Sequence, residues 1–231
     1  VKGQTIVLDV TTPKLSFLLL NGGNLIFDKD VDGLQLNSEF ILIMEDSVLE
    51  VGTEDEPFEK EAEIIMHGHT RCTELPIYGC KVIAVRKGAL ELHGRHINHT
   101  WTHLTSTADV GATQITVELD VSDWRVGDEI VIASTNDRHS MGENEKHKIA
   151  SIDSDGKTIT LETALKFKLI SLTQTFGDHE IKTRAEVGLL TRNILIRGEM
   201  GDECEPDELN ECQDIDFDHF GGHTRALEGF K

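Results

Sequence analysis

One stretch near the N-terminus carries the residue types and the spacing of a calcium-binding loop. Asp28, Asp30 and Asp32 alternate along the chain, Gly33 follows, and Glu39 lies six residues after the glycine. Alternate carboxylates can turn inward around a cation, the glycine permits a sharp bend, and the glutamate can bind with both oxygens. The spacing predicts a calcium site, and calcium is the one cofactor that the sequence suggests. Because the flanking residues are strand-like rather than helical, a tight turn rich in Asp and Gly is the alternative interpretation.

A second acidic stretch, Asp202–Asp218, contains two of the four cysteines and could also bind calcium. Runs of charge are more often solvated surfaces, and this is the alternative for the stretch. The eleven histidines show no ligand spacing together with a carboxylate partner, so we interpret them as structural. The spacing of the histidines and carboxylates predicts no catalytic residues.

The cysteines form two pairs of equal spacing, Cys72 with Cys80 and Cys204 with Cys212. Zinc ligands usually lie two to four residues apart, so this spacing favours two local disulfides that staple loops, although four cysteines allow three connectivities. Asn98-His99-Thr100 is a glycosylation sequon, which makes Asn98 a candidate glycan site. Disulfides and a sequon together predict an extracellular location.

The charge of the chain limits its partners. Forty-two acidic residues against 22 basic ones give a net charge of −20, which argues against nucleic acid and anionic membrane surfaces. No apolar run approaches the roughly 18 residues needed to cross a bilayer, so this segment is not expected to insert into a membrane. The chain opens within a strand and ends without a capping element, and we expect it to be a piece of a longer protein.

The elements that must position these residues are β-strands. Residues 18–27, 42–51 and 83–92 repeat one pattern of apolar run, tight polar turn and apolar alternation, and their turns are 24 and then 41 positions apart. Such a unit cannot bury its apolar face alone and must stack on its neighbours. The pattern predicts an all-β fold, a right-handed parallel β-helix with disulfide-stapled loop insertions. An antiparallel sandwich is the alternative.

The second half of the chain has a different period. An insertion at Gly52–Cys80 precedes it, and Asp137–Lys148 lacks periodicity and is predicted to be a surface loop. The turn Trp124–Asp128 leads into an apolar run, which predicts a buried strand after it. Short strands are expected at Gln114–Leu119, Glu129–Ala133, Thr158–Leu161 and Asn193–Arg197.

Several motifs together resemble the eight-glycine domain and the segment that follows it in the fibrocystin and fibrocystin-like family. The first part is carried by Gly52–Phe58, Ile65–Gly68 and Leu90–Gly94, and the second by Trp124–Ile130 and Arg184–Ile194. The resemblance covers nearly the whole chain. It implies an eight-glycine domain at 1–100 that forms the first β-helix rungs, a continuing β-helix segment at 101–231, and a membrane-anchored parent protein at the cell surface.

One departure separates the chain from the hyaluronan-degrading relatives of this family. Those relatives carry an extra domain just after the counterpart of Leu92–Gly94, whereas here Trp101 continues directly into Asp109–Thr116. The resemblance therefore implies the fibrocystin-like branch, and hyaluronidase activity is not carried over.

Three hypotheses about function follow. We favour a non-enzymatic extracellular recognition or scaffold module that contacts a protein or glycan through the loops Glu54–Cys80 and Asp137–Lys148. The second is a glycan-degrading enzyme, hyaluronidase-like, because β-helices often host such enzymes. The third is a calcium-stabilised spacer. A groove for the enzyme would be lined by Arg184, Glu186, Arg192 and Arg197; the alternative is an ion-pair network around the turn at Glu186.

Overall fold

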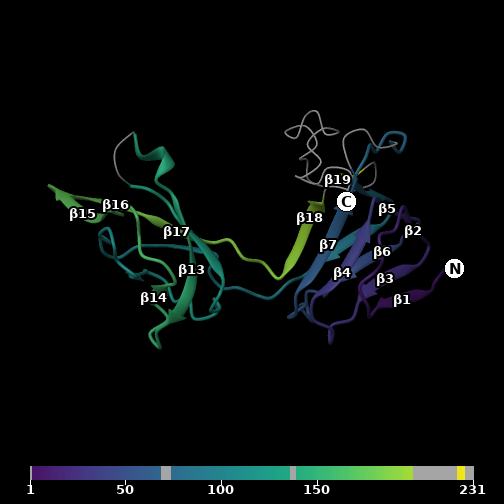
Figure 1. Cartoon of the computed structure of the whole chain (residues 1–231), viewed down its shortest axis with the longest axis horizontal. Coiled ribbons are helices and arrows are strands. Elements are labelled where there is room, and N and C mark those ends of the chain that lie inside the picture. Colours follow the sequence, from purple (N-terminus) through teal and green to yellow (C-terminus); the bar gives the residue numbers. More distant parts are fainter. Residues whose placement is uncertain (1, 69–73, 136–138, 200–222, 227–231) are drawn as a thin grey trace, which may run out of the picture. The chain divides into compact units, whose positions relative to one another are not determined.

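Period-two alternation of aliphatic residues makes β-strands the main secondary structure of the described residues. The structure is a computed structural model, and it describes residues 2–68, 74–135, 139–199 and 223–226. The described residues divide into two compact units (Figure 1). Unit 1 comprises Val1–Arg95 and Arg192–Lys231, and unit 2 comprises His96–Thr191. No described helix is long and apolar enough to span a membrane.

Unit 1 contains three short parallel sheets with strand orders β1-β3-β6-β9, β4-β7-β18 and β2-β5-β8-β19. From β2 to β9 each sheet takes every third strand along the chain. The strands are β1 (Thr5–Leu8), β2 (Leu18–Asn21), β3 (Asn24–Phe27), β4 (Leu34–Ser38), β5 (Phe40–Met44), β6 (Val48–Val51), β7 (Ala62–His67), β8 (Val82–Arg86), β9 (Ala89–Leu92), β18 (Ile194–Glu199) and β19 (His223–Ala226).

The repeated stretches align in register as predicted. Leu25 pairs with Leu49, and Leu49 pairs with Leu90, so the steps of 24 and 41 residues become neighbouring strands. Alternate side chains point inward and form one aliphatic core, in which the rings of Phe27 and Phe58 meet edge to face at 6.5 Å. The predicted insertion at 52–80 is more than a loop, because β7 lies within it and pairs with β4.

Glycine is required where this insertion leaves β6. Gly52 has φ +73°, and a Cβ there would lie 2.5 Å from both the His93 carbonyl oxygen and the Phe58 amide nitrogen. Any other residue would be strained in this conformation and would clash with two backbones. The glycine thus allows Phe58, whose amide donates to the His93 carbonyl at 2.8 Å, to enter the core.

Unit 2 contains an antiparallel sheet of six strands in the order β10-β17-β12-β13-β14-β11 and a two-stranded antiparallel sheet, β15-β16. A bridge between Leu104 and Val117 joins the two outer strands of this order, so the sheet curls upon itself around a second aliphatic core. The elements are β10 (Trp101–His103), β11 (Gln114–Thr116), β12 (Glu129–Ile132), a 3₁₀ turn η1 (Ser140–Gly142), β13 (Glu145–Ile152), β14 (Thr158–Leu161), β15 (Ser171–Phe176), β16 (His179–Arg184) and β17 (Glu186–Leu189).

The predicted fold class is therefore wrong for the chain as a whole. Parallel pairing is confined to three short sheets, and His96–Thr191, predicted to continue a right-handed β-helix, is antiparallel. Turns of a few residues such as Asp153–Lys157 join adjacent antiparallel strands, whereas parallel neighbours need long crossovers. Of the cysteines that would staple the predicted loops, only Cys80 belongs to the described residues, so no disulfide-stapled loop can be assigned among them.

Strand β13 corrects a second prediction. Residues 145–148 were expected to belong to a surface loop, but they pair with β12, and Glu145 and His147 are buried. The turn at Trp124–Asp128 behaves as predicted: the Arg125 amide donates to Asp128 Oδ2 at 2.8 Å, and Ile130 in the following strand is fully buried.

Candidate recognition surfaces

The predicted calcium residues form a tight turn between β3 and β4. Asp28 Oδ1 accepts a hydrogen bond from the Asp30 amide at 3.0 Å, and Asp32 Oδ1 accepts one from the Glu61 amide at 2.9 Å. A lysine already contributes positive charge here: Lys29 Nζ lies 3.0 Å from Glu56 Oε2. This hydrogen bond is the main reason that the pKa of Lys29 is raised above 10.5.

Glu39 does not join these aspartates. It follows β4, whose five residues extend over about 16 Å, and its carboxylate forms an ion pair with Lys14 at 3.4 Å. Within the described part of the chain, no group of three or more histidine, cysteine or acidic side chains is placed to hold a metal ion. The structure thus favours the alternative interpretation of a turn, and calcium binding there stays a prediction.

The predicted disulfide and glycan residues are only partly described. Cys72, Cys204, Cys212 and the acidic stretch 202–218 lie outside the described residues. Cys80 is not a free thiol, but its pairing with Cys72 stays a prediction. Asn98 is exposed in the segment before β10, and its backbone amide donates to Asp123 Oδ2 at 2.6 Å. An exposed Asn98 is compatible with the predicted glycan.

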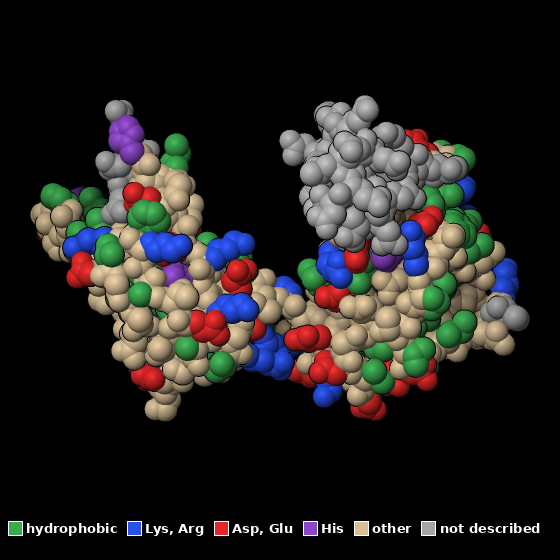
Figure 2. Space-filling model, in the orientation of Figure 1, with side chains coloured by type: hydrophobic (Ala, Val, Ile, Leu, Met, Phe, Trp, Pro, Cys, Tyr) green, Lys and Arg blue, Asp and Glu red, His purple; other side chains and the backbone are tan. Residues whose placement is uncertain are grey.

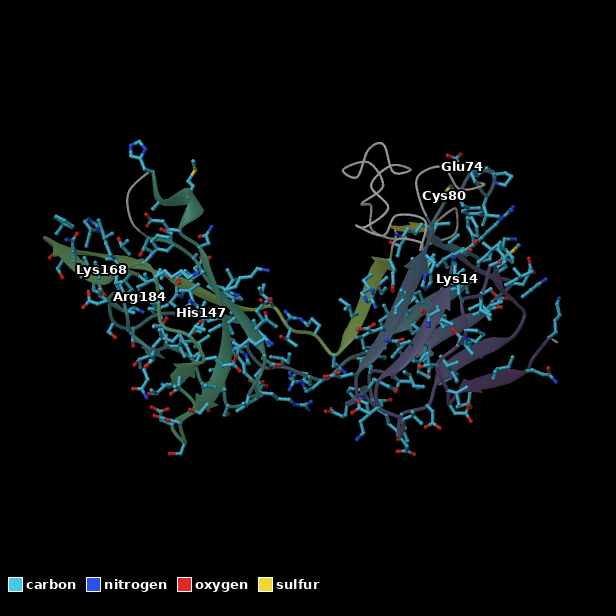
Figure 3. The ribbon with its side chains drawn as sticks, in the orientation of Figure 1. Lys14, Glu74, Cys80, His147, Lys168 and Arg184 are labelled. Carbon is cyan, nitrogen blue, oxygen red and sulfur yellow. The ribbon has the colours of Figure 1, made fainter. Side chains whose placement is uncertain are left out.

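The four residues of the hypothetical catalytic groove are divided between the units. Arg184, labelled in Figure 3, and Glu186 belong to unit 2. Arg184 Nη1 donates to Glu118 Oε1 at 2.9 Å. Arg192 and Arg197 belong to unit 1. The ion pair with Glu118 agrees with the ion-pair alternative for Arg184.

Arg197 is part of a hydrogen-bonded row that crosses the outer face of the β4-β7-β18 sheet. Its Nε donates to Glu63 Oε2 at 3.2 Å, and its Nη1 donates to Glu199 Oε2 at 3.0 Å. On the other side, Gln35 Nε2 donates to the same Glu63 oxygen at 3.3 Å. We call Gln35, Glu63, Arg197 and Glu199 the polar row. Figure 2 shows this mixture of basic and acidic side chains on the described surface of each unit.

A histidine continues the same face of the sheet. Asn37 Nδ2 donates to the Thr12 carbonyl, which turns Asn37 Oδ1 toward His67 Nε2 at 2.9 Å, so Nε2 carries the proton. Desolvation is the main cause that lowers the pKa of His67 below 6.5, and Glu199 opposes it. His67 is therefore a neutral hydrogen-bond donor at neutral pH, in agreement with its predicted structural role.

A buried lysine supports the end of the polar row. Lys81 is 1% exposed, and its Nζ donates to the Glu199 carbonyl at 2.8 Å. Burial is the main cause that lowers its pKa below 10.5. No sequence pattern predicts a role for this lysine, because it stands directly before an ordinary apolar strand.

The N-terminal part of the chain matches a known protein family. Residues 1–105 match the G8 domain family. The chain therefore carries a G8 domain, and the family resemblance inferred from the glycine-punctuated motifs is confirmed.

The chain is similar to fibrocystin-L over most of its length. Identity is 49% over 230 residues with fibrocystin-L of Mus musculus, covering 99% of this chain and 5% of that protein. With fibrocystin-L of Homo sapiens it is 51% over 198 residues, 85% of this chain and 5% of that protein. The cell migration-inducing and hyaluronan-binding protein of Homo sapiens is 38% identical over 130 residues, 55% of this chain and 9% of its own length. The chain thus spans about one twentieth of the fibrocystin-L proteins.

Proposed function

We propose that this chain is a non-enzymatic extracellular recognition or scaffold module of a fibrocystin-like protein, anchored in the membrane and presented at the cell surface. The observation that carries the proposal is the polar row. A glycosidase needs two carboxyl groups that flank the bond to be cut. Here Arg197 lies between Glu63 and Glu199 and binds both of them, so a guanidinium occupies the place between the two carboxylates where a sugar bond would have to lie.

The similarity to fibrocystin-L over most of the chain supports the same proposal. A rigid β-sheet scaffold with paired surface charges suits a module that holds a shape and presents side chains to a ligand. The second candidate, a glycan-degrading enzyme, is kept because one relative with a matching segment is named for hyaluronan binding. A calcium-stabilised spacer would need Glu39 to approach the aspartates from the far end of β4.

Two measurements on the purified chain test the proposal. High-molecular-weight hyaluronan is incubated with it in calcium or in EDTA, and the polymer is then sized. We expect no shortening in either. Calcium-dependent shortening that is lost in Arg197→Gln, or in the double variant Arg184→Gln with Glu186→Gln, would make the chain an enzyme.

The second measurement applies the labelled chain to cultured cells. A recognition module should bind saturably and be displaced by unlabelled chain. Binding that grows without saturation would contradict recognition.

A further inference from the structure

The outer face of the curled sheet in unit 2 presents a tryptophan to solvent. The chain has two tryptophans: Trp124 is 3% exposed and belongs to the core, whereas Trp101 on β10 is 54% exposed. An indole is a large apolar surface that is usually buried, and exposing it on a rigid strand is a common feature of recognition sites. Trp101 does not belong to the hydrophobic core of unit 2.

The surface beside this indole is flat. Trp101 pairs across the strands with Gly188, Gly188 with Val131, and Val131 with Lys146, so these four residues share the outer face in one row. Gly188 has no side chain, and an added Cβ would meet only Val131 Cγ1, at 3.5 Å. Gly188 is one strand spacing, about 5 Å, from Trp101, so an open strip over this glycine lies directly beside the ring, and the side chains of Val131 and Lys146 follow it.

Polar groups border the other side of the indole. The His103 ring stands edge to face against it, with the ring centres 5.1 Å apart. His103 Nδ1 lies 3.7 Å from Glu118 Oε2, and Glu118 Oε1 accepts the hydrogen bond from Arg184 Nη1. The apolar indole ring therefore has an imidazole, a carboxylate and a guanidinium group in succession beside it. We call Trp101, His103, Glu118, Arg184 and Gly188 the Trp101 platform.

We propose that the Trp101 platform binds an uncharged glycan. The C–H face of a pyranose ring is flat and apolar and matches the indole, with space over Gly188 for the next ring. The neighbouring hydroxyl groups of the same sugar can donate to Glu118 and accept from Arg184, and hydrogen bonds to charged groups are the stronger ones. This inference rests on the proposed recognition function and names its ligand class.

Charge and shape select this occupant over others. The face carries charges of both signs, with Glu129 and Glu186 beside Lys146 and Lys148, so it offers no excess of positive charge to an anionic polysaccharide, and the net charge of −20 on the chain repels one. An apolar peptide side chain binds best in a concave pocket, which a flat strip does not offer. A glycan attached to Asn98, three residues before Trp101, is a competing occupant that the experiment must separate.

The test is titration of the full chain with neutral oligosaccharides of glucose, galactose, mannose and N-acetylglucosamine, with a hyaluronan oligosaccharide for comparison. Tryptophan fluorescence is a suitable signal because Trp124 is buried and only Trp101 can meet a ligand. We expect a neutral sugar to bind with a dissociation constant of about 1 mM and at least about tenfold more tightly than hyaluronan. Binding to the Trp101→Ala variant is measured by calorimetry and should be weaker by about tenfold or more. Gly188→Val should also weaken binding, because the valine side chain would cover the open strip.

The matched control is Phe176→Ala, which removes an exposed aromatic ring from β15 in the same unit and should leave sugar binding unchanged. Binding of no neutral sugar, equal binding by Trp101→Ala, or tighter binding of hyaluronan would overturn the inference. The inference would also be overturned if enzymatic removal of a glycan from Asn98 changed the tryptophan fluorescence but the chain then bound no added sugar. If saturable cell binding persists in any of these cases, the recognition function stands and only its glycan assignment fails.

Discussion

Glu145 shows how one buried carboxylate organises a loop of unit 2. It is 5% exposed and accepts hydrogen bonds from the backbone amides of Lys166, at 2.9 Å, and Phe167, at 2.8 Å. Its Oε2 also lies 3.1 Å from His147 Nε2, and His147 Nδ1 is 2.9 Å from the Thr163 hydroxyl. The pair thus joins β13 to the segment that leads from β14 to β15.

Replacing Glu145 by alanine should destabilise unit 2 strongly. The change leaves two backbone amides and the imidazole without their shared acceptor, and each buried unsatisfied donor costs about 1–3 kcal/mol. We expect a loss of about 3 kcal/mol in the free energy of unfolding, measured by urea titration with tryptophan fluorescence. Glu145→Gln keeps one acceptor oxygen and should lose less. Glu162→Gln, at an exposed position, is the control, and equal stability of Glu145→Ala and this control would contradict the assigned role.

At the residue scale, the sequence predicted which residues share a local turn better than which distant residues contact one another. Asp28, Asp30 and Asp32 do lie together in a turn, because local spacing fixes a turn. The calcium-loop pattern, which belongs to loops between helices, places Glu39 with these aspartates. In the structure the five-residue strand β4 separates Glu39 from them. The sequence does not predict the burial of Glu145 and His147, because all residues from Glu145 to Lys148 are polar and show no alternation of apolar and polar types. Their side chains nevertheless alternate between the core and solvent.

A single asparagine attaches strand β18 to the rest of unit 1. Asn193 Nδ2 donates to the carbonyls of Phe58, at 2.5 Å, and Lys60, at 2.8 Å, while its Oδ1 accepts from the Arg95 amide at 3.0 Å. The side chain therefore satisfies three backbone groups from two distant segments. Strand β18 begins at the next residue and pairs with β7 over its whole length.

Asn193→Asp should loosen this strand more than Asn193→Ala does. The carboxylate would face two carbonyl oxygens, so repulsion is added to the loss of two donated hydrogen bonds. We expect amide hydrogen exchange of residues 194–199 to accelerate at least about tenfold, equivalent to about 1.4 kcal/mol of local opening free energy. The exposed Asn21→Asp is the control for added charge. Unchanged exchange in Asn193→Asp would show that strand pairing alone holds β18.

The elements of unit 1 were more predictable than those of unit 2. Turn residues and period-two alternation located most of the described strands of unit 1, but only β11, β12 and β14 in unit 2. The aligned repeats predicted the register of β3, β6 and β9. Strand β7 was hidden in the supposed insertion, since its core residues Ala62, Ile64 and Met66 follow a long acidic stretch without a turn signal of their own. Its partner β18 lies more than 130 residues later, and no local pattern reports so distant a pairing.

At the scale of the molecule, two separate cores were not foreseen, because short strands with aliphatic alternation look alike in parallel and antiparallel sheets. The direction of pairing depends on the connections, and the tight turns of unit 2 are the signal that distinguishes it. Residues 96–191 interrupt unit 1 in sequence, yet each unit buries its own aliphatic cluster. Each core should therefore set the stability of its own unit.

Unfolding measured with two probes tests this independence. Both tryptophans belong to unit 2, so fluorescence follows that unit alone, whereas far-ultraviolet circular dichroism follows the strands of both. Leu49 in unit 1 and Ile130 in unit 2 are both fully buried, and alanine at either site should cost about 3 kcal/mol. Leu49→Ala should lower the circular dichroism midpoint and leave the fluorescence midpoint in place, while Ile130→Ala should lower the fluorescence midpoint. If Leu49→Ala shifts both signals equally, the two cores unfold as one cooperative unit, because a separate unit 2 would not sense a cavity in unit 1.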